Sequence, residues 1–196
     1  MSQFLETIRC CNGILENLDG HHARLNRTRR HFFGAKTDWD LAEQVQVPAG
    51  LLPNQVYRCR IIYGEKLESV EFIPYQIRPI HSLQLVQAND LDYAFKYANR
   101  SALDALRVGS SADEVLIVKN GLLTDTTYAN VAFYDGSRWL TPAQPLLEGT
   151  RRAALLAAGV IHPEILRPQD LPRFQRARLF NALISWEEAP ELTQFR

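Results

Sequence analysis

The sequence predicts a mixed α+β protein with two lobes, and three features indicate that class. Runs of alternating or continuous apolar residues end at Asn-Gly or Asp-Gly pairs, which is the pattern of antiparallel hairpins. Segments with apolar residues three and four positions apart, typical of amphipathic helices, alternate with these strands. A connection over residues 74–90, with prolines at positions 74 and 79, divides the chain into a hairpin-and-helix half and a strand-rich half. We therefore expect one lobe at residues 1–82 and another at residues 83–196.

The first lobe is expected to hold two pairs of strands and two helices. Asn12-Gly13 after the first apolar run indicates a type I′ turn, because both residues accept a positive φ. Gly34 is a suitable residue to end the first helix. The expected elements are strands over residues 4–11 and 14–18, helices over 21–33 and 38–45 (with Trp39, Ala42 and Val45 on one face of the second), and strands over 56–63 and 67–73.

The second lobe is expected to begin with a strand over residues 83–88 and an amphipathic helix from Leu91 onward. Lys96 falls on the polar side of that helix, so the residues alone indicate a solvated lysine with Asp92 one turn earlier. The apolar face of the helix would consist of Phe95, Ala98, Ala102 and Leu106. The remaining expected elements are a buried strand at 115–118, a turn at Asn120-Gly121, strands over 130–134 and 138–140, a helix over 150–158 ended by Gly159, and a strand over 177–184.

Composition is that of an ordinary globular protein and excludes several classes. The 22 basic residues balance 22 acidic ones, so no overall charge points to nucleic acid or to a membrane surface. The first residues resemble no signal peptide, and the longest apolar run, residues 153–161, is too short to span a bilayer. The three cysteines at positions 10, 11 and 59 form no disulfide framework or zinc motif, and we expect them to be buried thiols. These features predict a cytoplasmic protein.

Three polar segments could carry chemistry. The first is a basic run on the first helix, which is expected to be a solvated face but could include one anion ligand; it consists of His21, His22, Arg24, Arg27, Arg29, Arg30 and His31. The second is Gly149-Thr150-Arg151-Arg152 at the start of a helix, where free N–H groups and the helix dipole favour an anion. The third is the polar stretch around Asp125. With a reactive lysine at position 96, these supply the groups that a pyridoxal phosphate site needs.

The order of the motifs resembles the class IV aminotransferases, the fold-type IV pyridoxal phosphate enzymes. This family includes branched-chain and D-amino-acid aminotransferases and 4-amino-4-deoxychorismate lyase. The resemblance covers nearly the whole chain. The matching motifs are Phe4-Leu5-Glu6-Thr7, His21-His22-Ala23-Arg24-Leu25, Lys96-Tyr97-Ala98-Asn99-Arg100, Asp125 five residues before Asn130, Leu140-Thr141-Pro142, Leu147-Glu148-Gly149-Thr150-Arg151-Arg152 and Asn181-Ala182-Leu183.

The resemblance implies a two-lobed D-amino-acid-aminotransferase-like fold, with a small N-terminal α/β lobe and a larger strand-rich C-terminal lobe that binds the cofactor. It implies a homodimer that binds pyridoxal 5′-phosphate and acts on a small amino-group-bearing acid. Lys96 would form the Schiff base and act as general base, Arg24 would contact the phosphate, and Asp125 would face the pyridine nitrogen. The other implied cofactor-binding residues are Asn130, Leu147 under the ring, Gly149, Thr150 and Arg151 at the phosphate, and Asn181 and Ala182 in a nearby turn.

Several positions depart from the family pattern and leave the reaction open. The acid is Asp125 where the family has glutamate, and Thr150 and Arg151 replace its isoleucine and threonine. The segment before Phe4 is shorter than usual, and Ser101 stands where some aminotransferases have tyrosine. Asn99-Arg100 and Asn181-Ala182-Leu183 most resemble 4-amino-4-deoxychorismate lyase. An amino-acid aminotransferase and a non-catalytic relative remain the alternatives, and a nucleic-acid-binding module on the basic helix is the hypothesis from another class.

Overall fold

The computed structural model describes residues 2–195, which divide into two compact units. The N-terminal unit contains the chain up to Ile77 together with Phe95–Asn99, and the C-terminal unit contains Arg78–Ala94 and the chain from Arg100 onward. The sequence predicts a boundary at residues 82–83, with Lys96 in the second lobe. In the structure the segment that carries Lys96 belongs to the N-terminal unit.

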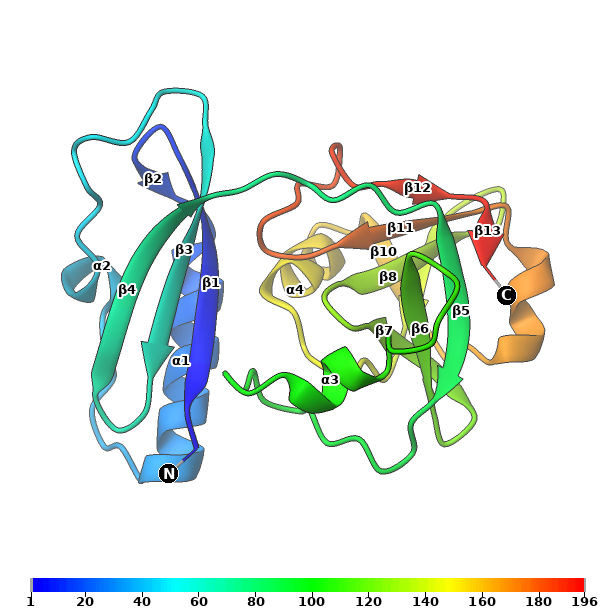
Figure 1. Ribbon diagram of the computed structural model, residues 1–196, viewed down its shortest axis with the longest axis horizontal. Helices are drawn as coiled ribbons and strands as arrows, with labels where there is room; N and C mark the ends of the chain where they lie inside the picture. Colours follow the sequence, from blue (N-terminus) through cyan, green and yellow to red (C-terminus); the bar gives the residue numbers. More distant parts are fainter. Residues whose placement is uncertain (1, 196) are drawn as a thin grey trace. The chain divides into compact units, whose positions relative to one another are not determined.

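The N-terminal unit is a four-stranded antiparallel sheet with helix α1 along one face (Figure 1). The strand order is β2-β1-β3-β4. The core between sheet and helix contains Phe4, Ile8 and Leu25, all fully buried. The elements are β1 Phe4–Cys11, β2 Ile14–Leu15, α1 Leu18–Phe33, α2 Leu41–Gln44, β3 Val56–Tyr63 and β4 Leu67–Pro74.

Most predictions for this unit are confirmed, and two need correction. Strands β1 and β3 have the predicted bounds, and the turn has φ 50° at Asn12 and 76° at Gly13. The return strand stops at Leu15, because Asn17 takes a left-handed conformation and α1 already begins at Leu18. The second helix is only one turn long. Its side chain facing the core is Leu41, whereas Ala42, which was predicted to share a face with Trp39 and Val45, is exposed.

The predicted helix around Lys96 is wrong. Residues 95–99 are not helical, and they lie along the edge of β1. The Leu5 N–H donates to the Lys96 carbonyl at 2.9 Å, and the Ala98 N–H donates to the Gln3 carbonyl at 2.8 Å. Helix α3 covers only Ser101–Ala105, where Leu103 is the buried residue and Ala102, which was predicted to face the core, is exposed. Strand pairing with β1 therefore overrides the helical periodicity.

The C-terminal unit contains two sheets with a shared core (Figure 1). One sheet has the order β10-β9-β8-β11-β12 and the other β13-β5-β6-β7. Leu116 and Val118 of one sheet belong to the same apolar cluster as Val131 and Phe133 of the other. The elements are β5 Ser82–Gln87, α3, β6 Glu114–Lys119, β7 Leu122–Thr126, β8 Asn130–Tyr134, β9 Trp139–Pro142, α4 Thr150–Ala157, β10 Ile161–Glu164, the 3₁₀ helix η1 Pro168–Arg173, β11 Arg176–Phe180, β12 Glu191–Leu192 and β13 Gln194–Phe195.

Predictions for this unit are confirmed in its regular elements. Residues 115–118 are fully buried on β6, and Asn120 and Gly121 have the positive φ angles of a hairpin turn. Helix α4 begins at Thr150, as predicted. The last predicted strand is too long, since β11 ends at Phe180, and β7, β10, β12, β13 and η1 were not predicted. Within residues 2–195, no helix is long and apolar enough to cross a bilayer.

Candidate functional site

A buried polar cluster occupies the interface between β1 and α1 in the N-terminal unit. Glu6 shares the inner face of β1 with Phe4 and Ile8, since residues two apart on a strand point the same way. His21 and Arg24 are three residues apart and therefore share one face of α1. The Arg24 Nε donates to Glu6 Oε1 at 2.9 Å and its Nη2 donates to Oε2 at 2.5 Å. The His21 Nδ1 lies 2.6 Å from Glu6 Oε2.

The charges in this cluster are well defined. Burial alone would raise the pKa of Glu6, but the charge and hydrogen bonds of Arg24, together with His21, lower that pKa to about 2. Burial lowers the pKa of His21, and this effect outweighs the hydrogen bond and charge of Glu6, which raise the pKa; the positive charges of Arg24 and Lys96 lower it as well. At neutral pH, Glu6 is therefore ionised, and burial favours the neutral form of His21. Lys96 lies close enough for its charge to act on His21, so this unit brings Arg24 and Lys96 into one electrostatic cluster.

Aromatic rings hold the Lys96 segment on the N-terminal unit. The two neighbours of Lys96 both join a ring cluster. Tyr97 lies 5.1 Å from Phe4 between ring centroids, and Phe95 lies 4.8 Å from Phe32. Together with the two backbone hydrogen bonds to β1, these contacts fix the main chain on either side of Lys96.

In the C-terminal unit, Asp125 is the centre of a second polar cluster. Asp125 on β7 is buried, and its Oδ1 accepts a hydrogen bond from the Asn130 Nδ2 at 2.8 Å. Its Oδ2 accepts one from the Leu147 N–H at 2.8 Å, and the Asn130 amide also donates to the Leu147 carbonyl at 3.0 Å. Burial raises the pKa of Asp125 to about 6, although the Leu147 N–H, the Asn130 amide and the Arg152 charge all lower it. A cation placed next to this carboxyl group would lower its pKa and favour the ionised form.

The turn before α4 packs directly on this cluster. Gly149 precedes the helix, and a Cβ atom added there would overlap with the Asn130 Oδ1. Arg152 is buried one residue beyond Arg151 and donates from Nη2 to the Pro142 carbonyl at 2.8 Å. Within the described part of the chain, the Arg152 Nε has no hydrogen-bond partner. A buried cation with an unsatisfied donor, next to a helix N-terminus that opens on glycine, fits a phosphate group.

Asn181 and Ala182 follow the end of β11. The Asn181 Nδ2 donates to the Tyr128 carbonyl at 3.2 Å, and its Oδ1 accepts from the Leu183 N–H at 2.9 Å. Arg100 donates to the Thr127 carbonyl at 2.7 Å. Asn181 and Arg100 therefore both hold the loop between Asp125 and Asn130, and Ala182 is a half-buried part of the same turn.

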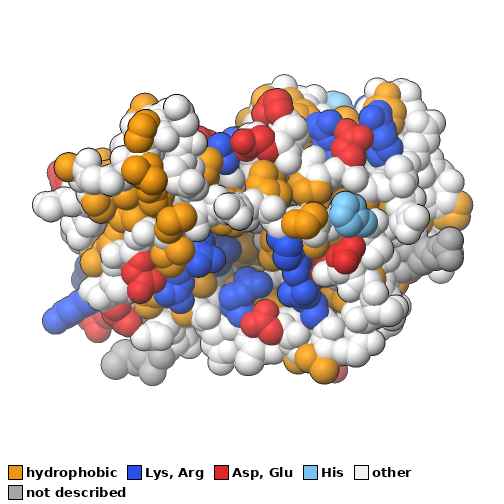
Figure 2. Space-filling view, turned by 45° about the horizontal axis from the view of Figure 1, so that its top comes forward, with side chains coloured by type: hydrophobic (Ala, Val, Ile, Leu, Met, Phe, Trp, Pro, Cys, Tyr) orange, Lys and Arg blue, Asp and Glu red, His pale blue; other side chains and the backbone are white. Residues whose placement is uncertain are grey.

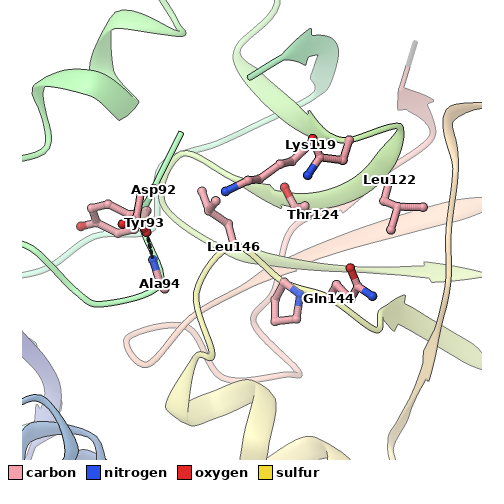
Figure 3. Close-up of a pocket in the computed structure, with 10 residues that line it drawn as sticks. Asp92, Tyr93, Ala94, Lys119, Leu122, Thr124, Gln144 and Leu146 are labelled. Carbon is pink, nitrogen blue, oxygen red and sulfur yellow. Dashed lines mark hydrogen bonds between the residues drawn. The ribbon is translucent and has the colours of Figure 1, made fainter. Parts of the chain in front are cut away.

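A pocket of about 240 Å³ lies beside this cluster within the C-terminal unit (Figure 3). Its lining includes Thr124 and Leu146, the chain neighbours of Asp125 and Leu147, and the Lys119 side chain extends toward the segment Asp92–Ala94. Adjacent residues on a strand point to opposite faces, so Thr124 faces the pocket and Asp125 faces away from it. The pocket is therefore distinct from the Asp125–Asn130–Gly149 cluster.

The predicted site residues thus fall into two groups, one in each unit. Arg24 and Lys96 belong to the N-terminal unit, and Asp125, Asn130, Leu147 and Gly149 form a hydrogen-bonded and packed set in the C-terminal unit. Glu6, His21 and Arg152 had no predicted role. Glu6 and His21 lie inside matched motifs, but only the packing of β1 on α1 shows that they bind each other.

The basic run on α1 is only in part the solvated face that was expected: Arg27, Arg30 and His31 are exposed. His21, Arg24 and Arg29 are all buried. Arg29 stacks on Trp39 with its Cζ 3.8 Å from the ring centroid, and donates to Asn26. Elsewhere, acidic and basic side chains are interspersed on the surface shown in Figure 2. Two of the four arginines of this run, Arg24 and Arg29, are therefore engaged inside the unit.

Comparison with known proteins identifies the family. The family model for class IV amino-transferases matches residues 3–189, and the chain belongs to that family. An uncharacterized protein of Haemophilus influenzae is 34% identical over 186 residues, covering 93% of this chain and 98% of the relative. A Schizosaccharomyces pombe protein provisionally named aminodeoxychorismate lyase is 27% identical over 161 residues, covering 76% of this chain and 63% of the relative.

Solved structures confirm the predicted fold. A crystal structure of a protein from Haemophilus somnus 129PT, provisionally named 4-amino-4-deoxychorismate lyase, has a TM-score of 0.84 at 28% identity and covers 93% of this chain and 97% of that protein. An aminotransferase from Brucella abortus, solved with pyridoxal phosphate bound, shares the fold with a TM-score of 0.74 at 17% identity, over 98% of this chain and 81% of its own.

Proposed function

We propose that this protein is a pyridoxal-phosphate-dependent lyase that releases pyruvate from 4-amino-4-deoxychorismate and leaves 4-aminobenzoate. The observation that carries the proposal is Asp125, a buried carboxylate held by Asn130 and by the Leu147 N–H, at the position where the family pattern has its pyridine-binding acid. Membership of the class IV aminotransferase family supports the cofactor. The names of the Haemophilus somnus and Schizosaccharomyces pombe relatives support the reaction.

Each residue would have one task at the cofactor. Pyridoxal phosphate supplies an electron sink for the bond broken next to the substrate amine. Lys96 would hold the cofactor covalently and then accept and return the proton at the substrate carbon. Asp125 would accept a hydrogen bond from the protonated ring nitrogen, and its raised pKa would fall beside that cation.

The remaining residues would bind and orient. Arg24, the N–H groups of the turn at Gly149, the Thr150 hydroxyl and Arg151 would bind the phosphate, together with the buried Arg152. Leu147 would pack under the ring. Asn130, Asn181 and Ala182 would keep the surrounding loops in place, as the hydrogen bonds of the two asparagines indicate.

The first experiment tests the cofactor. Purified protein mixed with pyridoxal phosphate should gain the visible absorption band of a lysine-bound cofactor, and Lys96→Ala should abolish that band. Lys36→Ala is the matched control, because Lys36 is exposed and lies outside both clusters. A wild-type spectrum that shows only free cofactor would contradict the proposal.

A second experiment separates the lyase from an aminotransferase. The cofactor-loaded protein should release 4-aminobenzoate and pyruvate from 4-amino-4-deoxychorismate in equal amounts. Amino transfer to 2-oxoglutarate or pyruvate without 4-aminobenzoate would favour an aminotransferase of the branched-chain or D-amino-acid type. Absence of both activities together with a normal cofactor band would favour a non-catalytic relative. Asp125 in place of the family's glutamate is the feature that supports this alternative.

We also propose a cytoplasmic homodimer. The three cysteines are free thiols, two of them buried, which fits a reducing compartment. The dimer is proposed from the family alone, and light scattering on the purified protein tests it, since a monomeric mass at micromolar concentration would contradict it.

A further inference from the structure

Among the described residues of the N-terminal unit, Glu6 is the most completely buried charged side chain, and all its hydrogen bonds given above go to two side chains of α1. Its side chain is 0% exposed. One oxygen accepts from the Arg24 Nε, and the other accepts from the Arg24 Nη2 and faces the His21 Nδ1. None of these contacts involves a backbone group. Its hydrogen bonds therefore orient the Arg24 guanidinium and the His21 ring.

A buried ion pair is an inefficient way to stabilise a core. Two charges lose their hydration on burial, and well-packed apolar residues of similar volume are often equally stable or more so. The interface between β1 and α1 already contains Phe4, Ile8 and Leu25. We therefore attribute to the Glu6–Arg24 pair the fixed orientation of the Arg24 side chain, and not a gain in stability.

The bidentate geometry determines which part of Arg24 faces Glu6. A guanidinium has five N–H donors in a rigid plane, and Glu6 engages the edge formed by Nε and Nη2. With that edge fixed, the plane of the group and the direction of its other edge are set before any anion arrives. An arginine that is already ordered loses less entropy when it binds a ligand.

We propose that Glu6 is the positioning residue for the cofactor's phosphate, and that it acts by holding the Arg24 guanidinium in its binding orientation with His21 as the third member of the cluster. This inference rests on the proposed function, since it assumes that Arg24 binds the phosphate.

The variant Glu6→Gln removes the bidentate ion pair with Arg24 and changes the side-chain volume little. Both carboxylate oxygens accept hydrogen bonds, so the amide NH₂ of glutamine faces an Arg24 donor in either orientation. The guanidinium must then rotate or leave a donor unsatisfied. Loss of one charge-assisted hydrogen bond changes an equilibrium by roughly tenfold or more.

The test compares two ligands that differ only in the phosphate. Binding of pyridoxal phosphate and of pyridoxal is measured by the visible absorption band in wild type, Glu6→Gln and the control Glu16→Gln, which removes the carboxylate of the Arg9–Glu16 pair in the same unit. We expect Glu6→Gln to weaken pyridoxal phosphate roughly tenfold or more and to leave pyridoxal unchanged. Equal weakening of both ligands would show a merely structural role and overturn the inference, and so would tighter binding of pyridoxal phosphate.

A second variant keeps the test decisive if Glu6→Gln does not fold. Arg24→Lys retains the positive charge but cannot make the bidentate contact. It should produce the same selective loss of pyridoxal phosphate over pyridoxal, and an unchanged ratio would overturn the inference. Where both variants fold, the double variant should be no worse than Arg24→Lys alone, because both changes act through one guanidinium. If wild type binds neither ligand, the proposed function fails and not only the role of Glu6.

Discussion

Gly149 and Asn130 illustrate how one residue can depend on another in this site. Gly149 has φ −69° and ψ 141°, a conformation open to any residue. What excludes a side chain is the Asn130 amide, which occupies the space of the missing Cβ while it bonds Asp125 and Leu147. Gly149 therefore supports the packing of the Asp125–Asn130 cluster as well as the start of α4.

Gly149→Ala should displace the Asn130 amide and cost about 1–3 kcal/mol of stability, the usual cost of overpacking. The cofactor band should also weaken, because the Asp125 cluster and the turn are disturbed together. Thermal unfolding with and without pyridoxal phosphate measures both effects. Gly50→Ala is the control, since Gly50 has no positive φ and no atom near its added Cβ. Wild-type stability for Gly149→Ala would contradict this account.

The raised pKa of Asp125 predicts a pH dependence in the cofactor-free protein. Its pKa is about 6 in the fold against an ordinary 3.8, so the stability that the neutral carboxyl contributes is present below pH 3.8 and is lost as pH rises through 6. At about 1.4 kcal/mol per pKa unit, the loss is on the order of 3 kcal/mol. Urea unfolding between pH 4 and pH 8 should show it, and Asp125→Asn should flatten the profile. If wild type and Asp125→Asn showed the same dependence of stability on pH, the raised pKa would not belong to Asp125.

At the level of elements, the segment Phe95–Asn99 is the part of the structure that the sequence predicted least well. Its apolar spacing is typical of a helix. The segment nevertheless pairs with the start of β1, on the edge that β2 covers only at Cys10 and Cys11. Such a pairing depends on residues far apart in the chain, and local periodicity carries no information about it. Strands β1, β3 and β6 were predictable because alternation or continuous burial and a following turn define them locally.

Phe95→Ala should loosen the Lys96 segment without unfolding the N-terminal unit. The change removes the ring contacts with His31 and Phe32, and a destabilising substitution usually costs about 0.5–3 kcal/mol. Amide hydrogen exchange should accelerate at Leu5 and Ala98, whose N–H groups make the two hydrogen bonds of this segment. Phe72→Ala is the control, since Phe72 packs on the same core from β4. Equal acceleration in the two variants would contradict a specific role for Phe95.

For the whole molecule, the two units are not two consecutive pieces of chain. The N-terminal unit is completed by five residues that follow a stretch of the C-terminal unit. The candidate site was predictable where motifs set it, as in the five-residue spacing of Asp125 and Asn130 that the structure closes with a hydrogen bond. The partnership of Glu6, His21 and Arg24 was not predictable, because it requires knowing which face of β1 meets α1.

The discontinuity predicts how fragments behave. A fragment of residues 1–77 lacks the pairing that covers the edge of β1, and an open edge invites association with other chains. It should aggregate when expressed alone and become soluble when co-expressed with residues 78–196. Co-purification and size-exclusion chromatography measure this. A soluble monomeric 1–77 fragment would show that residues 95–99 are dispensable for the unit.

The same pairing sets an order of events during synthesis. The Leu5 N–H leaves the ribosome early, but its acceptor on Lys96 is made about 90 residues later, a delay on the order of ten seconds at usual elongation rates. During that interval β1 presents a bare edge in the nascent chain, and a chaperone that shields extended segments would act there. The residue that we propose to bind the cofactor is therefore also the one whose arrival closes this edge.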